Sequence, residues 1–260
     1  GRAGILSEAV MRVRPLAAEE NFHAVFYPDW EAAVAAARDI TQAELPLSML
    51  RLSNEIETET QLALAGKPDL IKWLGRYLRL RGIGGSEQCM MFLGLTGDRR
   101  RCRFALRETL RIARQHGGVH VGNGIGKSWA KNRFHGPYLR NTLWDIGYGA
   151  DTVETSVDWS RVTPAMRAME QAARDAFAGF NEKVHAFTHL SHVYPQGSSV
   201  YSTFVFRATP DPDENYARWQ ALKKGVSEAV VAHGGTISHQ HGVGKDHAPY
   251  LAAEKTPLGL

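Results

Sequence analysis

Two histidines near the C-terminal end of the chain are well suited to moving protons. His239 and His241 flank Gln240 in a segment that begins at Gly234–Gly235. Imidazole changes its protonation near neutral pH, and the flanking glycines permit a sharp turn or a close backbone approach to a ligand. The same pattern is also typical of a helix end and a turn, so spacing alone leaves both interpretations open.

Three further side chains are candidates for acid–base or anion-binding chemistry. Tyr201 falls on the more polar face of a predicted strand over 200–207, whose phenylalanines alternate onto the other face. Arg51 stands between two leucines in a predicted strand, where a cation needs an ionic partner or a ligand. Arg140 falls in a predicted helix. Taken alone, Tyr201 is equally consistent with a rim residue and Arg140 with a surface residue.

A glycine-rich run over 122–128 is reminiscent of nucleotide-binding loops but does not fit them. A phosphate-binding loop needs glycine where Val121 stands, and a dinucleotide fingerprint needs a small residue where Lys127 stands. We therefore predict an irregular glycine loop that joins two elements.

Three histidines, His185, His189 and His192, crowd a predicted strand over 184–193 and suggest a metal. Side chains alternate along a strand, so His192 should point away from the other two. Zinc normally takes three or four converging ligands. We therefore predict no metal site.

The composition describes an ordinary globular chain. Of its 260 residues 43% are hydrophobic and 22% charged, and the net charge is +4. Basic residues are dispersed apart from those in 99–103, which argues against nucleic-acid binding. No apolar run approaches the ~20 residues of a membrane span. The two cysteines, Cys89 and Cys102, form no disulfide framework or zinc motif and predict a reduced, cytoplasmic protein.

The predicted elements follow an order that occurs twice. A strand over 89–95 and a helix over 98–116 lead through His-Gly-Gly into a short strand. A strand over 200–206 and a helix over 212–233 lead through a second His-Gly-Gly into 236–238. The repeat predicts an α+β, ferredoxin-like domain of duplicated split βαβ units, with a largely antiparallel sheet covered by helices.

The remaining elements complete this plan. A glycine-rich turn at the start feeds a strand and is typical of the middle of a longer polypeptide. Patterning predicts strands over 5–14, 22–27, 48–53 and 151–158 and helices over 30–43, 55–81, 138–148 and 160–181.

Five segments match, in order, motifs of one enzyme family. They read Gly-Arg-Ala-Gly-Ile-Leu from residue 1, Leu-Arg-Leu-Ser-Asn from 50, Tyr-Leu-Arg from 138 with Glu-Thr-Ser-Val-Asp-Trp from 154, Ser-Val-Tyr from 199 and His-Gln-His-Gly from 239. Together they resemble the C-terminal, substrate-binding half of FAD-linked oxidases in the vanillyl-alcohol-oxidase-like superfamily. Within it they look most like the alkyldihydroxyacetonephosphate (alkylglycerone-phosphate) synthase family.

The resemblance implies a division of the chain. Residues 1–15 would be the last turn and strand of an otherwise missing FAD-binding domain, with Gly4 and Ile5 contacting the flavin. Residues 16–260 would be the substrate-binding domain, truncated at its C-terminal end. FAD would be held mainly by the missing domain, so we expect this fragment alone to be inactive.

The resemblance also implies roles for the candidate residues. Tyr201, His239 and His241 would be catalytic, Arg140 would hold a substrate phosphate, and Arg51 would neutralise a second anionic group or the reduced flavin. The reaction would exchange the acyl group on dihydroxyacetone phosphate for an alkyl group, as in ether lipid synthesis, through a flavin N5 adduct and without net redox change.

One departure keeps alternatives open. Gln240 replaces the middle of three successive histidines in the synthase loop, and it also replaces a metal-binding glutamate of the superfamily's hydroxy-acid dehydrogenases. An FAD-linked oxidase or dehydrogenase of a hydroxy acid or alcohol is one alternative, and a stand-alone binding module without flavin is another. The expected partners are a small-molecule substrate, phosphorylated or lipid-like, and the chain's own FAD-binding domain. A homodimer and a peripheral membrane contact are compatible with the resemblance.

Overall fold

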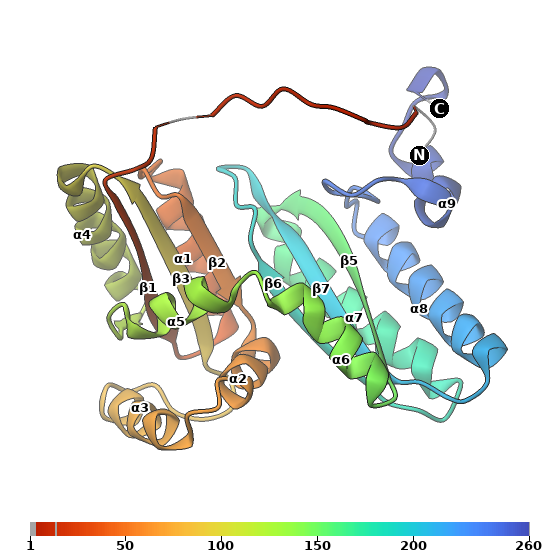
Figure 1. Cartoon of the computed structure of the whole chain (residues 1–260), viewed down its shortest axis with the longest axis horizontal. Helices are drawn as coiled ribbons and strands as arrows, with labels where there is room; N and C mark the ends of the chain where they lie inside the picture. The colour runs from red at the N-terminus through yellow and green to blue at the C-terminus, as the bar shows by residue number, and fades with distance from the viewer. Residues whose placement is uncertain (1–3, 14, 260) are drawn as a thin grey trace.

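A seven-stranded antiparallel sheet forms the centre of the protein, with the strand order β4-β1-β3-β2-β6-β7-β5 (Figure 1). The computed structural model describes residues 4–13 and 15–259. The strands are β1 Glu19–Tyr27, β2 Met49–Ser53, β3 Cys89–Gly97, β4 Val119–His120, β5 Tyr148–Asp158, β6 Val184–Leu190 and β7 Gly197–Arg207. The predicted α+β fold with a largely antiparallel sheet is confirmed.

Helices cover both faces of this sheet. In Figure 1, α5 and α6 lie in front of the strands, and α1 and α7 lie behind them. The helices are α1 Trp30–Gln42, α2 Glu55–Leu64, α3 Pro68–Leu80, α4 Arg99–Gln115, α5 Gly124–Asn132, α6 Leu139–Asp145, α7 Val162–Ala178, α8 Pro212–Ala232 and α9 Gly244–His247, with short 3₁₀ turns at Gly136–Tyr138, Trp159–Arg161, Ala248–Ala253 and Pro257–Gly259.

The sheet is built from two ferredoxin-like units, as the repeat predicts. In the first, β1, α1, β2, β3, α4 and β4 occur in this order, with α2 and α3 inserted between β2 and β3, and the strands take the order 4-1-3-2. In the second, β5, α7, β6, β7 and α8 lead to residues 236–238, where the amide of Thr236 donates to the carbonyl of Ser156 on β5 at 3.3 Å. The two units join where β2 pairs with β6. β2 and β6 are the edge strands of their units, so this pairing joins the two units into one continuous sheet.

Burial on the strands follows their alternation. On β1, Ala24 and Phe26 contribute to one hydrophobic cluster and Val25 and Tyr27 to another, so the strand is buried on both faces. On β7, the phenylalanines are buried while Tyr201 is only half-buried, as predicted. The half-buried face of β7 is therefore the one available to a ligand.

Both His-Gly-Gly turns end a helix. Gly117 and Gly234 have φ angles of 75° and 66°, a left-handed conformation that glycine adopts without strain. The next residue in the second turn, Gly235, lies so close to the hydroxyl of Thr155 on β5 that a Cβ atom would collide with it. The turn therefore directs residues 236–241 along β5.

Three sequence predictions are wrong in detail. Residues 5–13 form no strand, and Ile5 is 97% exposed, because no strand among the described residues takes up their backbone hydrogen bonds. Residues 1–3 and 14 lie outside the described residues. The glycine run is not an irregular loop, since α5 begins at Gly124. Strand β6 ends at Leu190, so its alternation does not extend to His192.

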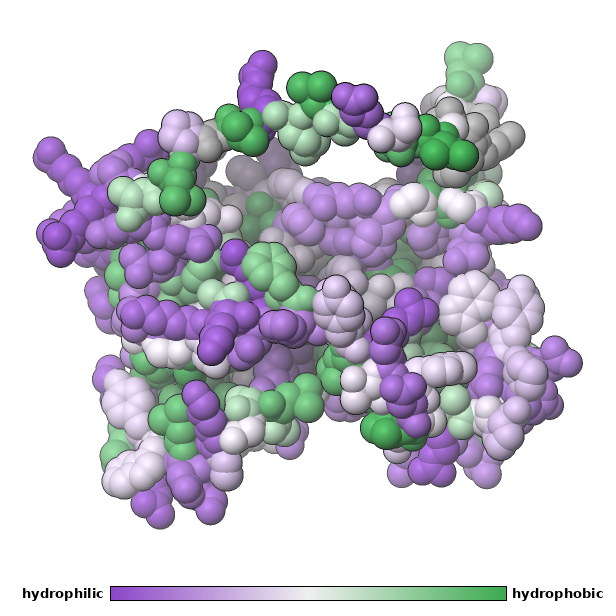
Figure 2. All heavy atoms as spheres, in the orientation of Figure 1, coloured by the Kyte–Doolittle hydropathy of each residue, from purple (hydrophilic) through white to green (hydrophobic). Residues whose placement is uncertain are grey.

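The surface is mostly hydrophilic with apolar side chains between, as Figure 2 shows for one face. The amphipathic α3 exposes an apolar stripe, with Trp73 68% exposed beside the cation Arg76. Among the described residues, no helix has the length and apolar character needed to cross a bilayer.

Candidate functional site

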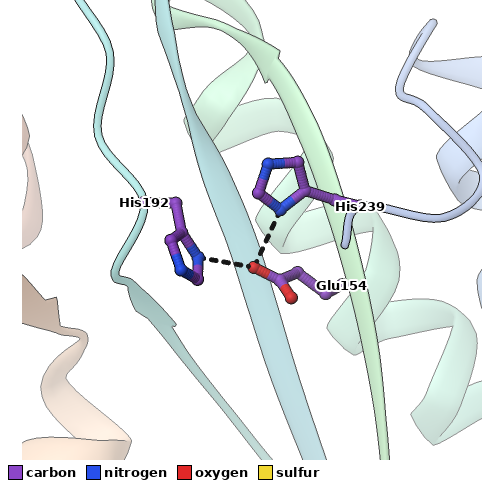
Figure 3. Close-up of side chains that lie close together, drawn as sticks. All are labelled: Glu154, His192 and His239. Carbon is purple, nitrogen blue, oxygen red and sulfur yellow. Dashed lines mark hydrogen bonds and ion pairs between the residues drawn. The ribbon is translucent and has the colours of Figure 1, made fainter. Parts of the chain in front are cut away.

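A buried carboxylate, Glu154, contacts three histidines, two of which, His192 and His239, are shown in Figure 3. Its Oε1 lies 3.1 Å from Nδ1 of His192 and 3.1 Å from Nδ1 of His239, and its Oε2 lies 3.3 Å from Nε2 of His241. The Glu154 side chain is only 2% exposed. It comes from β5, whereas the histidines come from the segment after β6 and from the segment after the second His-Gly-Gly turn. Glu154 therefore ties two loop segments to the sheet.

Tyr201 lies beside this cluster, because it pairs directly with Glu154 in the β5–β7 register. Its hydroxyl donates to Oγ1 of Thr152 at 3.2 Å. The ring of His241 stands edge-on to the phenol at a centroid distance of 6.0 Å, and the ring of His189 lies nearly parallel to it at 4.7 Å. The phenol is therefore flanked by two imidazoles.

A second buried carboxylate, Glu57, lies on the other side of Tyr201. Its Oε1 accepts from Nη2 of Arg51 at 2.6 Å and lies 3.1 Å from Nδ1 of His189. Asn54 caps the N-terminus of α2 by accepting from the Glu57 amide at 2.9 Å, which places Glu57 in the first helical turn. The predicted need of Arg51 for a partner is thus met within the chain.

Burial and neighbouring charges shift the pKa values of Glu57 and His189. Burial alone would raise the pKa of Glu57, but Arg51 and His189 outweigh it and hold that pKa well below its usual range. Burial lowers the pKa of His189, and the Arg51 cation lowers it further against the opposing effect of Glu57. At neutral pH the group is an Arg–Glu ion pair with a neutral imidazole.

The predicted site residues are brought together in part. Tyr201, His239 and His241 form one cluster, and Arg51 reaches it through His189. Arg140 lies elsewhere: it is exposed on α6 and lines a hollow of about 770 Å³ with Trp144, Tyr148, Asp151, Tyr216 and Trp219. The segment that holds Gly4 and Ile5 runs across the upper edge in Figure 1, away from the sheet.

Sequence reasoning missed four residues of the site. Glu154 opens the Glu-Thr-Ser motif but had no assigned role, and His189 and His192 were considered only as metal ligands. Glu57 carries no sequence signal, because its contact with His189 joins residues 132 positions apart. A buried glutamate facing a strand-central arginine is visible only in three dimensions.

The positions of Glu154, His192 and His239 bear on whether the cluster binds a metal ion. One ligand atom each from Glu154, His192 and His239 lie within 4.8 Å of one another, so this trio could hold a metal ion. The same atoms are also satisfied without one, because a proton on each Nδ1 makes a hydrogen bond to the shared carboxylate oxygen. The predicted lack of a metal stays a prediction.

The cluster has a hydrogen-bonded route to the surface. Nε2 of His239 lies 3.0 Å from the hydroxyl of Tyr194, which is 38% exposed. Glu154, His239 and Tyr194 therefore form a hydrogen-bonded chain, and Tyr201 lies beside its inner end. This arrangement suits acid–base chemistry on a ligand bound against the half-buried face of β7.

The chain belongs to the family of FAD linked oxidases, C-terminal domain, whose model matches residues 16–260. It is 26% identical over 98% of its length to alkyldihydroxyacetonephosphate synthase of Dictyostelium discoideum and 24% identical over 100% to that of Trypanosoma brucei brucei. It covers 43% of each, so it spans less than half of these curated relatives. A solved structure of alkyldihydroxyacetonephosphate synthase matches 86% of this chain, and 41% of its own chain is covered, with a TM-score of 0.76 at 21% identity. The predicted family resemblance is confirmed.

Proposed function

We propose that this chain is the substrate-binding domain of an FAD-dependent enzyme that exchanges the acyl group of an acyl-dihydroxyacetone phosphate for a fatty alcohol. Two relatives that span nearly the whole chain are alkyldihydroxyacetonephosphate synthases. The observation that carries the proposal is the phenol of Tyr201 between the rings of His189 and His241. This reaction needs a proton to leave and return at one carbon, which such a group supports.

We assign the proton transfer and the phosphate binding of this reaction to residues of the chain. Tyr201 removes the proton from the carbon beside the carbonyl, and His241 and His239 pass it toward Tyr194. The bond from that carbon to the ester oxygen breaks, and the acyl group leaves as a carboxylate. The alcohol loses its proton to the histidine cluster as its oxygen forms the new ether bond, and Tyr201 returns a proton to the carbon. No net oxidation occurs. Arg140 holds the phosphate by a fork of hydrogen bonds, which requires the ligand to bridge α6 and the cluster.

The residues present fit a contact with FAD at one point. Nε of Arg51 is a buried donor without a hydrogen-bond partner among the described residues, and it suits an oxygen of the flavin or of the substrate. When bound, FAD supplies the electron sink of the reaction. Its contacts with Gly4 and Ile5 and its retention by a preceding domain stay predictions, as do a homodimer and a membrane contact.

The experiment uses the full-length protein with FAD bound. Supplied with an acyl-dihydroxyacetone phosphate and hexadecanol, it should release one fatty acid for each ether product without consuming an electron acceptor. Tyr201→Phe should lower kcat by about 100-fold or more, since general acid–base catalysis contributes about that much. Tyr77→Phe, a change of an exposed tyrosine on α3, is the matched control and should keep full activity.

Two results would refute the proposal in different ways. Bleaching of the flavin by a hydroxy acid or alcohol, with consumption of an acceptor, would favour the FAD-linked oxidase or dehydrogenase. A full-length protein that carries no flavin would favour the stand-alone binding module. Full activity of Tyr201→Phe with unchanged flavin content would remove only the assignment of the acid–base residue.

A further inference from the structure

Glu57 lies behind the proposed acid–base residue rather than beside the substrate face. Its side chain is 5% exposed, and its Oε1 contacts His189, whose ring lies against that of Tyr201. No motif marks it, and neither the proton relay nor the phosphate contact uses it. Its role must therefore act through its two neighbours, Arg51 and His189.

The ion pair between Arg51 and Glu57 does not take the form that would satisfy both partners best. A two-pronged pair would join Nε and Nη2 of the arginine to both carboxylate oxygens. Here only Nη2 reaches the carboxylate, and both Nε of Arg51 and Oε2 of Glu57 lack a hydrogen-bond partner among the described residues. Oε1 is instead shared between Arg51 and His189. The shared oxygen thus orients the imidazole, while the Arg51–Glu57 pair keeps only one of its two possible hydrogen bonds.

This sharing selects one tautomer of His189. Nδ1 lies 3.1 Å from Nη2 of Arg51, which only donates, and 3.1 Å from Oε1 of Glu57, which only accepts when ionised. Nη2 already donates to Glu57 at 2.6 Å. A proton on Nδ1 that is donated to Oε1 therefore gives each of these three atoms, Nδ1, Nη2 and Oε1, a hydrogen-bond partner, and the lone pair is left on Nε2.

We propose that Glu57 is a positioning residue for Tyr201: it holds His189 as the Nδ1-protonated tautomer, with its ring flat against the phenol, and anchors Arg51 beside it. The role of Glu57 in turnover rests on the proposed function, whereas its effect on His189 does not. The carboxylate acts on the reaction through the orientation of these neighbours and touches no reacting atom.

Two substitutions separate orientation from charge. Glu57→Met keeps the side-chain size but removes the acceptor, so Arg51 becomes the polar neighbour of Nδ1 and donates to it. His189 should then switch to the Nε2-protonated tautomer. Glu57→Gln keeps an acceptor oxygen and should retain the original tautomer in large part. Glu59→Gln, which changes an exposed glutamate on the same helix, is the control.

The tautomer is measured by ¹H–¹⁵N correlation spectra of the full-length, FAD-bound protein labelled only in histidine. The His189 signal is assigned by its loss in His189→Asn. The same proteins are assayed for kcat and KM. We expect Glu57→Met to lower kcat by up to about 100-fold with KM nearly unchanged, as misplacement of an acid–base group does. Glu57→Gln should recover most of this loss.

The outcomes are distinct. An Nε2-protonated His189 in the unsubstituted protein, or an unchanged tautomer in Glu57→Met, would overturn the inference. If Glu57→Met does not fold, the tautomer of the unsubstituted protein and of Glu57→Gln decides the matter. If the unsubstituted protein shows the expected tautomer but no exchange of acyl for alkyl groups, the proposed function fails while the orientation of His189 stands.

Discussion

Replacement of Glu154 by glutamine tests whether one carboxylate holds the histidine cluster together. Glu154→Gln preserves side-chain volume but removes the charge shared by His192, His239 and His241. The amide oxygen still accepts hydrogen bonds, but the amide nitrogen now faces an imidazole that must change its tautomer to accept from it. The substitution therefore weakens all three contacts without creating a cavity.

The magnitude follows from the number and exposure of these contacts. A hydrogen bond to a charged group contributes about 1.5–3 kcal/mol and a neutral one about 0.5–1.5 kcal/mol, so each contact loses about 1 kcal/mol. His192 and His241 are 42% and 41% exposed, and solvent screening reduces their share. We expect the free energy of unfolding to fall by about 1–2 kcal/mol.

The assay is urea unfolding of the full-length protein, together with hydrogen exchange of residues 236–243. Exchange there should become faster, because Glu154 ties this segment to β5 through His239 and His241. The matched control is Glu228→Gln, which changes a carboxylate that is 58% exposed and should shift stability by less than about 0.5 kcal/mol. The reasoning is refuted if the two variants unfold alike and exchange in 236–243 is unchanged.

Two further predictions concern the scaffold. Burial and the neighbouring His120 lower the pKa of His23 from 6.5 to about 4, so the unfolded chain binds the proton more readily than the folded one. Folding stability should therefore fall as pH drops from about 6.5 to about 4. In His23→Gln the urea midpoint should depend less on pH across this range, and an equal pH dependence in both proteins would contradict the assignment. Gly235→Ala should cost about 1–3 kcal/mol by thermal or urea unfolding, because a Cβ there collides with Thr155. Gly75→Ala, at a helical position with open space, is its control and should be neutral or stabilising; equal effects would argue against the close contact.

Local patterns account for most of the correct fold predictions. The His-Gly-Gly turns predict helix ends because Gly117 and Gly234 need left-handed backbone angles. The alternation on β7 predicts the exposure of Tyr201, because side chains of a strand alternate every residue. Where the pattern was extended beyond an element, it failed: His192 lies past the end of β6 at Leu190, where no alternation applies.

The strand predicted over 5–14 failed for a related reason. Its apolar residues suit a strand, but a strand needs a neighbour for its backbone groups, and among the described residues none pairs with it. The glycine run at 122–128 was predicted to be a loop, but most of it belongs to helix α5. Glycine there serves close packing, because α5 lies against β1 so tightly that Gly126 has no room for a Cβ beside the carbonyl of Phe22.

The sequence by itself determined the repeat, the ends of the helices, the faces of the strands and, through its motifs, the family, and it made Tyr201, His239 and His241 candidate site residues. Only the tertiary structure showed which buried carboxylates contact the histidines around Tyr201. Glu154 and His239 are 85 residues apart and Glu57 and His189 are 132 apart, so their contacts depend on sheet register and on the junction of two units. Propensity and periodicity act over a few residues, whereas a buried charge takes its partner from whatever the fold brings within a few ångströms.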